Sequence, residues 1–511
     1  MKRLVFRVLL VLLVSVSSPG IYGIAVGAGA PQGGPQQCLS LNIPLDSYVY
    51  GYLDKLAGLG YLPEMRLGVK PYTRLQAAHW VEKINAQVNS RGDIPDYAAD
   101  MLAQLNQEFE PELQRLAGGP REPWLGLREW TASGSYYHGD TLKELGTKAS
   151  WQPLNTNNSG YRLADGGNWS LAARLEAELA PALVASVTPR VATNRDSTDV
   201  SLTAGYVKTQ LNNVEIQVGK EDAWWGQGVR GSRSLTNNAA PVTSLKLSNI
   251  DAMNWGFLGP TYVTMRYSVL ENDRSDVKYP SLVGLRCDFI PSNNFTFGLS
   301  RLDIVGGAGR MLTRSDLKNF IFGTNSDAAG DKWNTQAGGD FRWRLGNGVE
   351  VYGEVYGEDQ SGYMPSQLSE LAGLYIPKLN ASGDWEARLE FAHTLPCWYT
   401  HSVYTNGWVY KDNILGDYMG SDADRYYGQL AHYLPGGAQF SLNLEHLTQN
   451  ATGSGVQQKV DSFWLAAEQR LAPDVLLSAT VGVARVLNTN YHAGLTSHTG
   501  LASLTITEEF F

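Results

Sequence analysis

The chain has 511 residues, of which only 18% are charged and 11% aromatic, with 54 Gly, 26 Tyr and 14 Trp. Soluble proteins usually carry about a quarter charged residues. The composition therefore favours a transmembrane β-barrel with an apolar outer band and aromatic girdles, and leaves a large secreted β-protein as the alternative. The net charge of −9 argues against nucleic acid as a partner.

The first 28 residues have the features of a cleaved signal peptide. Lys2, Arg3 and Arg7 precede a short apolar run over 8–16, and 26–28 (Val-Gly-Ala) offers a cleavage site. No later segment reaches about 18 apolar residues without charges, so no transmembrane helix is expected. Because only helices and closed barrels satisfy their backbone in lipid, a membrane protein with this sequence must be a barrel.

A small helical module is predicted over 44–120, after a flexible Gly-Pro-Gln-rich lead-in at 29–43. Apolar residues recur at helical spacing in three stretches, which begin near Leu45, Pro71 and Pro95. Asp46 or Ser47 is a candidate cap for the first helix, and Pro111 is expected to kink the third. The three amphipathic helices are expected to pack on one another, and we expect the module to lie on the periplasmic side.

From residue 126 to residue 511 the apolar period changes to two, as in β-strands. Val351 and Val355 alternate with Glu350 and Glu354, for example. The region holds roughly 16–18 strands of a mainly β, antiparallel transmembrane barrel. Asn212-Asn213 is a candidate hairpin turn. The polar stretches predicted to be extracellular loops are 142–168, 222–254, 306–336, 357–372 and 411–424.

Three cysteines, Cys38, Cys287 and Cys397, are dispersed along the chain. A Cys287–Cys397 disulfide is possible, and the odd count leaves at least one thiol outside such a pair. Their spacing does not suggest a metal site.

Several segments form a characteristic series along the chain. In the helical module they are Pro44-Leu45-Asp46-Ser47-Tyr48, Leu53-Asp54-Lys55-Leu56 and Lys70-Pro71-Tyr72-Thr73-Arg74. In the barrel they include Val218-Gly219-Lys220-Glu221, Trp225-Gly226-Gln227-Gly228, Asn238-Ala239-Ala240-Pro241, Tyr352-Gly353-Glu354-Val355-Tyr356-Gly357-Glu358-Asp359, Trp385-Glu386-Ala387-Arg388-Leu389-Glu390-Phe391-Ala392-His393-Thr394, Tyr404-Thr405-Asn406-Gly407-Trp408 and Gly420-Ser421-Asp422-Ala423-Asp424. In their order and type these segments resemble the Wzi-type capsule assembly proteins. The Gly-Pro-Gln lead-in and the cysteines are not part of the pattern.

The resemblance implies an outer-membrane barrel of about eighteen strands with a small periplasmic helical bundle. It also implies a lectin-like protein that holds capsular or related exported polysaccharide at the cell surface. The partners then expected are that polysaccharide, outer-membrane lipids and the polysaccharide export machinery. A porin or transport channel is the alternative function, because the same barrel supports either.

Three constellations carry the aromatic rings and planar polar groups that a sugar-binding surface needs. The predicted polysaccharide-binding residues are Trp224 and Trp225 in the first, Tyr356, Glu358 and Asp359 in the second, and Tyr404, Trp408, Asp422 and Asp424 in the third. Each constellation also has a structural interpretation. The first would belong to an interfacial girdle, the second to a solvated loop, and the third would form hydrogen bonds inside a folded loop.

Neither a cofactor nor an enzyme activity is indicated by the sequence. Asp422 and Asp424 stand two apart, which would place both carboxylates on one side of an extended chain, but the segment lacks the regular spacing of a Ca²⁺ loop. No Gly-x-Ser-x-Gly or His-Glu-x-x-His pattern occurs. His393 is expected to be structural.

Overall fold

The computed structural model describes residues 39–120, 123–310, 312–314, 316, 320, 332–361 and 364–510. The signal peptide, the lead-in up to Cys38 and the terminal Phe511 lie outside these residues. In the described residues, no helix combines the length and apolar character needed to cross a bilayer.

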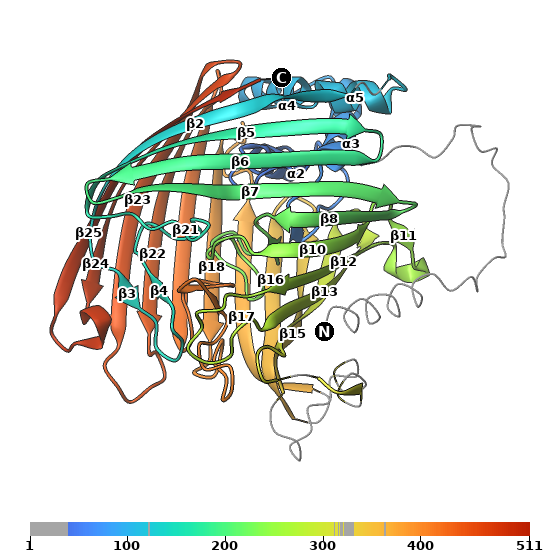
Figure 1. Ribbon diagram of the computed structural model, residues 1–511. Coiled ribbons are helices and arrows are strands. Elements are labelled where there is room, and N and C mark those ends of the chain that lie inside the picture. Colours follow the sequence, from blue (N-terminus) through green and yellow to red (C-terminus); the bar gives the residue numbers. More distant parts are fainter. Residues whose placement is uncertain are drawn as a thin grey trace.

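Eighteen antiparallel strands form one closed barrel, in which the first strand pairs with the last (Figure 1). The predicted fold class is confirmed. The strands of the ring are β2 (Trp124–His138), β5 (Gly166–Ala180), β6 (Leu183–Asn194), β7 (Thr198–Leu211), β8 (Val214–Lys220), β10 (Thr243–Asn249), β12 (Pro260–Val269), β13 (Ser281–Ser292), β14 (Phe295–Val305), β15 (Trp333–Arg344), β16 (Glu350–Ser361), β17 (Met364–Ile376), β18 (Trp385–Thr394), β21 (Ala423–Leu434), β22 (Ala438–Gln449), β23 (Gln458–Ala472), β24 (Val475–Leu487) and β25 (Thr496–Glu509).

Short elements complete the β structure. They are β1 (Val69–Lys70), β3 (Leu142–Lys143), β4 (Ser150–Trp151), β9 (Trp224–Trp225), β11 (Met253–Asn254), β19 (Val409–Tyr410) and β20 (Asn413–Ile414), with two 3₁₀ turns, η1 (Gly256–Leu258) and η3 (Thr489–Tyr491).

The two ends of the barrel differ. At one end, the short-turn end, strands are joined by tight connections such as the Asn212-Asn213 turn, where Asn212 has φ +51°. At the other, the long-loop end, lie the connections 139–165, 221–242, 270–280 and 395–422. Two predicted loops are partly wrong: 357–372 is mostly β16 and β17, and the predicted loop 222–254 contains β10 and β11 in its second half. Polar residues such as Glu358 and Ser369 are buried on the lumen side of these strands, and their polar character had suggested a loop.

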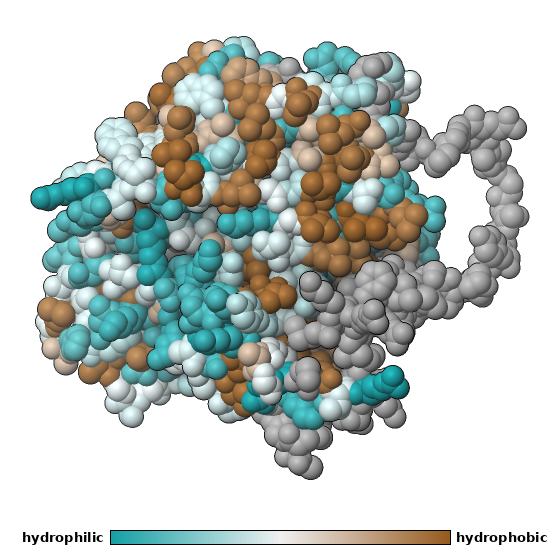
Figure 2. Space-filling view, viewed as in Figure 1, coloured by the Kyte–Doolittle hydropathy of each residue, from teal (hydrophilic) through white to brown (hydrophobic). Residues whose placement is uncertain are grey.

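Apolar and polar side chains alternate along the strands, so that the barrel has an apolar outer face and a polar interior. On β22, Phe440, Leu442 and Leu444 are exposed, whereas Asn443 and Glu445 are buried inside. Figure 2 shows such apolar side chains in patches over the face where β5–β8 run, with hydrophilic residues gathered toward the long loops. Exposed aromatic side chains lie near both ends of the strands, at Trp343, Trp385 and Phe440 toward the short-turn end and Tyr136, Trp169 and Tyr426 toward the long-loop end. This is the aromatic girdle pattern of outer-membrane barrels.

The helices of the described residues, α2 to α5, lie at the short-turn end (Figure 1). They are α2 (Val49–Gly58), α3 (Arg74–Arg91), α4 (Asp96–Glu108) and α5 (Glu110–Leu116). Thr73 caps α3 by accepting from the Gln76 backbone N–H, and Gly92 ends it with φ +72°. Ser47 Oγ accepts from the Val49 backbone N–H at the start of α2. Pro111 stands just after the break between α4 and α5, where a kink was predicted.

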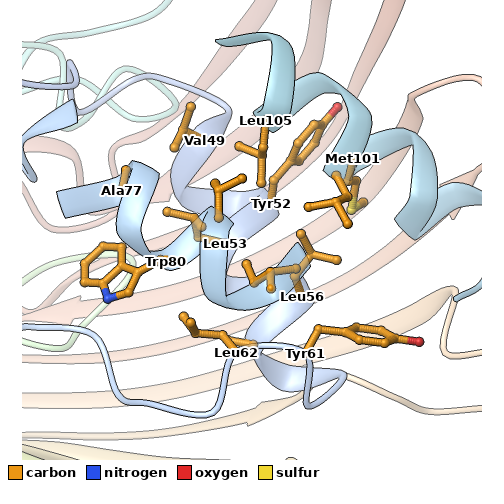
Figure 3. Packing of buried hydrophobic residues seen from close by; sticks show 14 of the residues in the cluster. Val49, Tyr52, Leu53, Leu56, Tyr61, Leu62, Ala77, Trp80, Met101 and Leu105 are labelled. Carbon is orange, nitrogen blue, oxygen red and sulfur yellow. The ribbon is translucent and has the colours of Figure 1, made fainter. Parts of the chain in front are cut away.

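The helices pack on one another, as expected, around Leu53, Leu56, Ile84, Met101 and Leu105 (Figure 3). They also dock on the strand connections: Lys55 Nζ donates to the Pro377 carbonyl at 2.7 Å, Tyr97 OH to that of Ser382 at 3.1 Å, and Gln104 Nε2 to that of Pro473 at 3.0 Å. The module therefore covers the short-turn end of the barrel.

Acid is expected to loosen this module through Glu108. Burial opposes ionisation of this carboxyl, but Arg74 and Arg128 hold its pKa at about 2, below the usual 4.5. Ionised Glu108 therefore stabilises the folded module above about pH 4.5, and this contribution, about 3 kcal/mol, is lost as the pH falls toward 2. Pepsin digestion of the helical region between pH 5 and pH 2 measures the loss. Glu108→Gln should digest readily at every pH; the same steep pH dependence in that variant would contradict the assignment.

Candidate functional site

The lumen of the barrel is filled by chain segments that enter it from both ends. The loop 221–242 from the long-loop end carries β9, which pairs antiparallel with β1 of the helical module: Trp225 faces Val69, and Trp224 faces Lys70. The Gly226 backbone N–H donates to the Gly68 carbonyl at 2.9 Å. We call residues 66–70, 221–242 and 395–422 the lumen plug.

Wall carboxylates hold the backbone of the plug. Glu354 on β16 accepts from the backbone N–H groups of Gln227, Gly228 and Arg233 at 2.7–2.8 Å, and from Ser232 Oγ at 2.9 Å. This single side chain satisfies three backbone donors that would otherwise be buried without partners, which makes it a strong anchor.

Glu390 on β18 does the same for the next residues of the loop. It accepts from the Val229 N–H at 2.5 Å, from the Arg230 N–H at 3.0 Å and from Tyr352 OH at 2.9 Å. The Arg230 guanidinium lies 4.7 Å from the centroid of the Trp464 ring and pairs with Glu445 at 2.7 Å. Loop 221–242 is thus fixed to β16, β18, β22 and β23.

A buried ionic cluster joins both plug loops to the wall. Asp417, in loop 395–422, pairs with Arg233 of loop 221–242 and with Arg425 of β21, the latter at 2.6 Å. The side chains of all three are 0% exposed. An ion pair buried in this way is tightly coupled, because removing one partner leaves the others charged and desolvated.

Glu358 on β16 anchors loop 395–422. It accepts from the Tyr399 backbone N–H at 2.6 Å and from Trp408 Nε1 at 3.3 Å. Tyr399 OH donates to the Arg233 carbonyl at 3.0 Å and accepts from the Asp417 N–H at 2.8 Å. The two loops therefore bind each other as well as the wall.

Two cavities lie beside the plug in the described residues. A polar cavity of about 80 Å³ lies between the helical module and β8, β10 and β12, where Glu215, Gln217 and Arg266 line it. A second, beside Asp222 and Leu415, holds about 20 Å³. Both cavities are large enough to hold ordered water. The geometry thus provides a closed barrel whose outward-facing loops are held rigid.

Comparison with known proteins agrees with this architecture. A family model described as "Capsule assembly protein Wzi" matches residues 137–501. The chain belongs to this family. A solved structure of Wzi from Escherichia coli, described as an outer membrane protein involved in group 1 capsule assembly and a carbohydrate binding β-barrel, superposes with a TM-score of 0.70. It shares 20% identity and covers 92% of this chain and 99% of that one, which shows the fold.

Two further comparisons are more distant. An uncharacterized 55.8 kDa protein from the cps region of Klebsiella pneumoniae is 28% identical over 181 residues. That match covers 33% of this chain and 35% of the relative, so only about a third of its length is spanned. OprD from Pseudomonas aeruginosa superposes with a TM-score of 0.44 at 10% identity, covering 75% of this chain and 93% of that one. This Wzi family member is an outer-membrane β-barrel.

Most residues predicted to bind sugar lie inside the plug. Trp225, Tyr356, Tyr404 and Trp408, far apart in the sequence, share one buried hydrophobic cluster. Tyr356 OH lies 2.6 Å from Ser300 Oγ, and Tyr404 OH donates to the Gly306 and Lys332 carbonyls at 3.1 Å. Trp224 is buried beside them on β9 rather than in a lipid-facing girdle, because its strand leaves the wall for the lumen.

The acidic residues that were predicted to bind sugar do not form one group in the structure. Glu358 anchors loop 395–422, and the side chain of Asp359 lies outside the described part of the structure. Asp422 has φ +47° and accepts from the Thr452 N–H and hydroxyl at 2.9 and 2.7 Å, whereas Asp424 pairs with His393 at 2.7 Å. The backbone turn at Asp422 therefore prevents the shared carboxylate face that an extended chain would give.

The cysteines do not form the disulfide that the sequence allowed: Cys287 on β13 and Cys397 in loop 395–422 are not bonded to each other. Cys38 lies outside the described residues.

Sequence reasoning missed the anchors Glu354, Glu390, Arg233 and Arg425. A signal for the two glutamates existed: each alternates with apolar neighbours on a strand, so it had to face the lumen. No local pattern identifies their partners, which come from loops more than a hundred residues away.

Proposed function

We propose that this Wzi family member binds capsular or related exported polysaccharide and anchors it at the cell surface. Family membership is the observation that carries the proposal. The carbohydrate binding described for the Escherichia coli relative supports it. The two loops that occupy the lumen, held there by Glu354, Glu390 and Glu358, favour binding over passage of a long polymer.

The orientation follows from general barrel architecture. Short turns usually face the periplasm and long loops the outside. The long-loop end therefore presents its loops to the polysaccharide. The helical module over 44–120 faces the periplasm, where we propose the export machinery as its partner. The apolar outer wall contacts outer-membrane lipids. We propose a binding role without catalysis.

The predicted sugar-binding role of Trp224, Trp225, Tyr356, Glu358, Asp359, Tyr404, Trp408, Asp422 and Asp424 stays a proposal. Because Trp225, Tyr356, Tyr404 and Trp408 are buried, any contribution they make to binding is through the shape of the loops they support. Many weak contacts along one repetitive polymer give retention without a deep pocket.

Deletion of the gene tests the anchoring role. We expect polysaccharide to move from the cell-attached fraction into the medium while total synthesis continues. Retention of the normal cell-attached amount would contradict the proposal. A large steady current from the purified full-length protein in a planar bilayer would instead favour a porin.

A further inference from the structure

The outer wall of the barrel has a hollow of about 970 Å³, which extends across β17, β18 and β21 to β25. Strands β21 to β25 lie side by side in the ring (Figure 1). A small residue leaves part of this space: a Cβ atom added to Gly428 of β21 would meet only one side-chain atom, of Leu389, at 3.5 Å. None of the residues that line the hollow was predicted to bind sugar, so the hollow is a separate feature of the wall.

One row of outward-facing residues forms the apolar floor of the hollow. Each member pairs with the next across neighbouring strands, in the order Leu374, Leu389, Gly428, Leu444, Phe463 and Val483. Leu389, Leu444 and Val483 are exposed on the lipid-facing side. Five steps of about 4.8 Å between strands make the floor about 24 Å wide, which leaves room for more than one acyl chain.

The next outward-facing row, toward the long-loop end, is mostly polar. Its members, again paired in order, are Phe391, Tyr426, His446, Asp461, Arg485 and His498. The last four stand two or three residues from the long-loop ends of their strands. Lys459 is partly exposed on the same face of β23 as Asp461. The apolar floor therefore ends at a polar edge, where the headgroup region of a bilayer begins.

Two cations of this edge have no acidic partner. Asp461 stands directly opposite Arg485, but its carboxylate pairs with His446 at 2.6 Å. Among the residues that the structure describes, neither Arg485 nor Lys459 has a carboxylate oxygen within ion-pair distance. The connections at the long-loop ends of their strands, 450–457 and 488–495, contain no acidic residue. Strands β23 and β24 thus present two unpaired cations at the edge of the hollow.

Acidic residues occur on either side of this pair of strands. Glu370 is exposed on β17, and Asp424 of β21 pairs with His393 at 2.7 Å. On the other side, Asp140 and Asp165 belong to loop 139–165, which follows β2. The edge as a whole is therefore mixed in charge, and an anionic group is attracted to β23 and β24 in particular.

We propose that the hollow binds a phosphorylated glycolipid of the outer leaflet, with its acyl chains on the apolar floor and a phosphate on Arg485 and Lys459. Guanidinium and ammonium groups bind phosphate oxygens through charge-assisted hydrogen bonds. The three strand steps from His446 to His498 span about 14 Å, which is wider than one phosphate. Imidazole and carboxylate groups along this edge form hydrogen bonds with sugar hydroxyls, so the edge fits a headgroup that carries sugars.

Lipid binding by the purified protein tests the inference. Full-length protein is delipidated in detergent and mixed with diphosphorylated lipid A, with the same lipid A after enzymatic removal of both phosphates, or with phosphatidylglycerol. Native mass spectrometry measures the bound fraction of each lipid. We expect diphosphorylated lipid A to bind at least tenfold more tightly than either of the others, because a charge-assisted hydrogen bond is worth roughly tenfold in affinity.

Matched variants locate the site. Lys459→Gln with Arg485→Gln should weaken lipid A binding about tenfold, whereas Arg195→Gln with Lys278→Gln, which removes the same charges from exposed loops at the same end of the barrel, should not. Heat-modifiable migration confirms that each variant is folded.

A second pair of variants tests the apolar floor. Gly428→Leu fills the hollow and should weaken binding of lipid A and of its dephosphorylated form alike. Ala173→Leu adds the same side chain to β5, between the exposed Leu171 and Leu175, and should change neither.

Four results would overturn the inference: no binding of lipid A, equal binding of its two forms, equal binding of phosphatidylglycerol, or equal losses in the hollow and control variants. A complex of two protein copies that Gly428→Leu abolishes would assign the hollow to a protein interface and likewise overturn it. The inference goes beyond the proposed function and shares with it only the orientation of the barrel. Release of polysaccharide by the deletion strain is independent of lipid A binding, so the two can fail separately.

Discussion

Replacing Asp417 by alanine is expected to turn the closed barrel into one that conducts ions. The change leaves Arg233 and Arg425 fully buried without their shared carboxylate. Breaking a buried pair in this way costs about 3–5 kcal/mol. The cluster joins loops 221–242 and 395–422 to β21. Its loss therefore destabilises the folded position of the plug, while the ring of eighteen strands keeps its hydrogen bonds.

Single-channel recording in a planar bilayer measures the effect. The unmodified protein should remain closed at moderate voltage, and Asp417→Ala should show frequent openings and faster proteolysis within 395–422. Asp273→Ala, an exposed carboxyl in the loop 270–280, serves as the control and should stay closed. A closed Asp417→Ala channel of unchanged protease resistance would show that Glu354, Glu358 and Glu390 suffice to hold the plug.

Introducing a charge at Leu56 is expected to unfold the helical module while the barrel survives. Leu56 is 0% exposed and belongs to the cluster that joins α2, α3 and α4 (Figure 3). Leu56→Asp removes a leucine, a loss that alone costs about 2–5 kcal/mol, and buries a carboxylate that has no partner there. The strands do not depend on this cluster for their backbone pairing.

Limited trypsin digestion of detergent-solubilised protein reports the result. Cleavage at Arg74 and Arg91 should become rapid in Leu56→Asp, with the barrel still shifting its gel migration on heating. Ala86→Asp places the same residue at an exposed position of α3 and should change cleavage little. Loss of the heat-modifiable form in Leu56→Asp would mean that the barrel needs the module to fold.

Much of the fold could be predicted from the spacing of apolar residues along the sequence. The spacing of apolar residues changes from helical to alternating near residue 126, and β2 begins at Trp124. Alternation is a local property: a strand between lipid and a polar interior must place apolar and polar side chains on opposite faces. The break at Pro111 and the Asn212-Asn213 turn were predictable for the same reason. The proline ring restricts the backbone next to it, and Asn readily adopts the left-handed φ of a tight turn, so both effects depend only on residues nearby in the sequence.

The candidate site was predictable only in part. Trp225, Tyr356, Tyr404 and Trp408 do come together, but in a buried cluster rather than on an exposed surface. An aromatic residue in a polar, glycine-rich stretch has the same sequence signature whether its loop points outward or folds into the lumen. The direction is decided by distant wall carboxylates such as Glu354, which accept the loop's backbone hydrogen bonds.

The sequence by itself determined that the chain forms a barrel with a helical module, because amphipathic period and strand length depend on neighbouring residues alone. Only the tertiary structure decided that loops 221–242 and 395–422 fold into the lumen, where Glu354, Glu390 and Glu358 of the wall hold them. The wall residues and the loops stand on separate segments, and their proximity arises from barrel closure and loop docking, which no local pattern encodes.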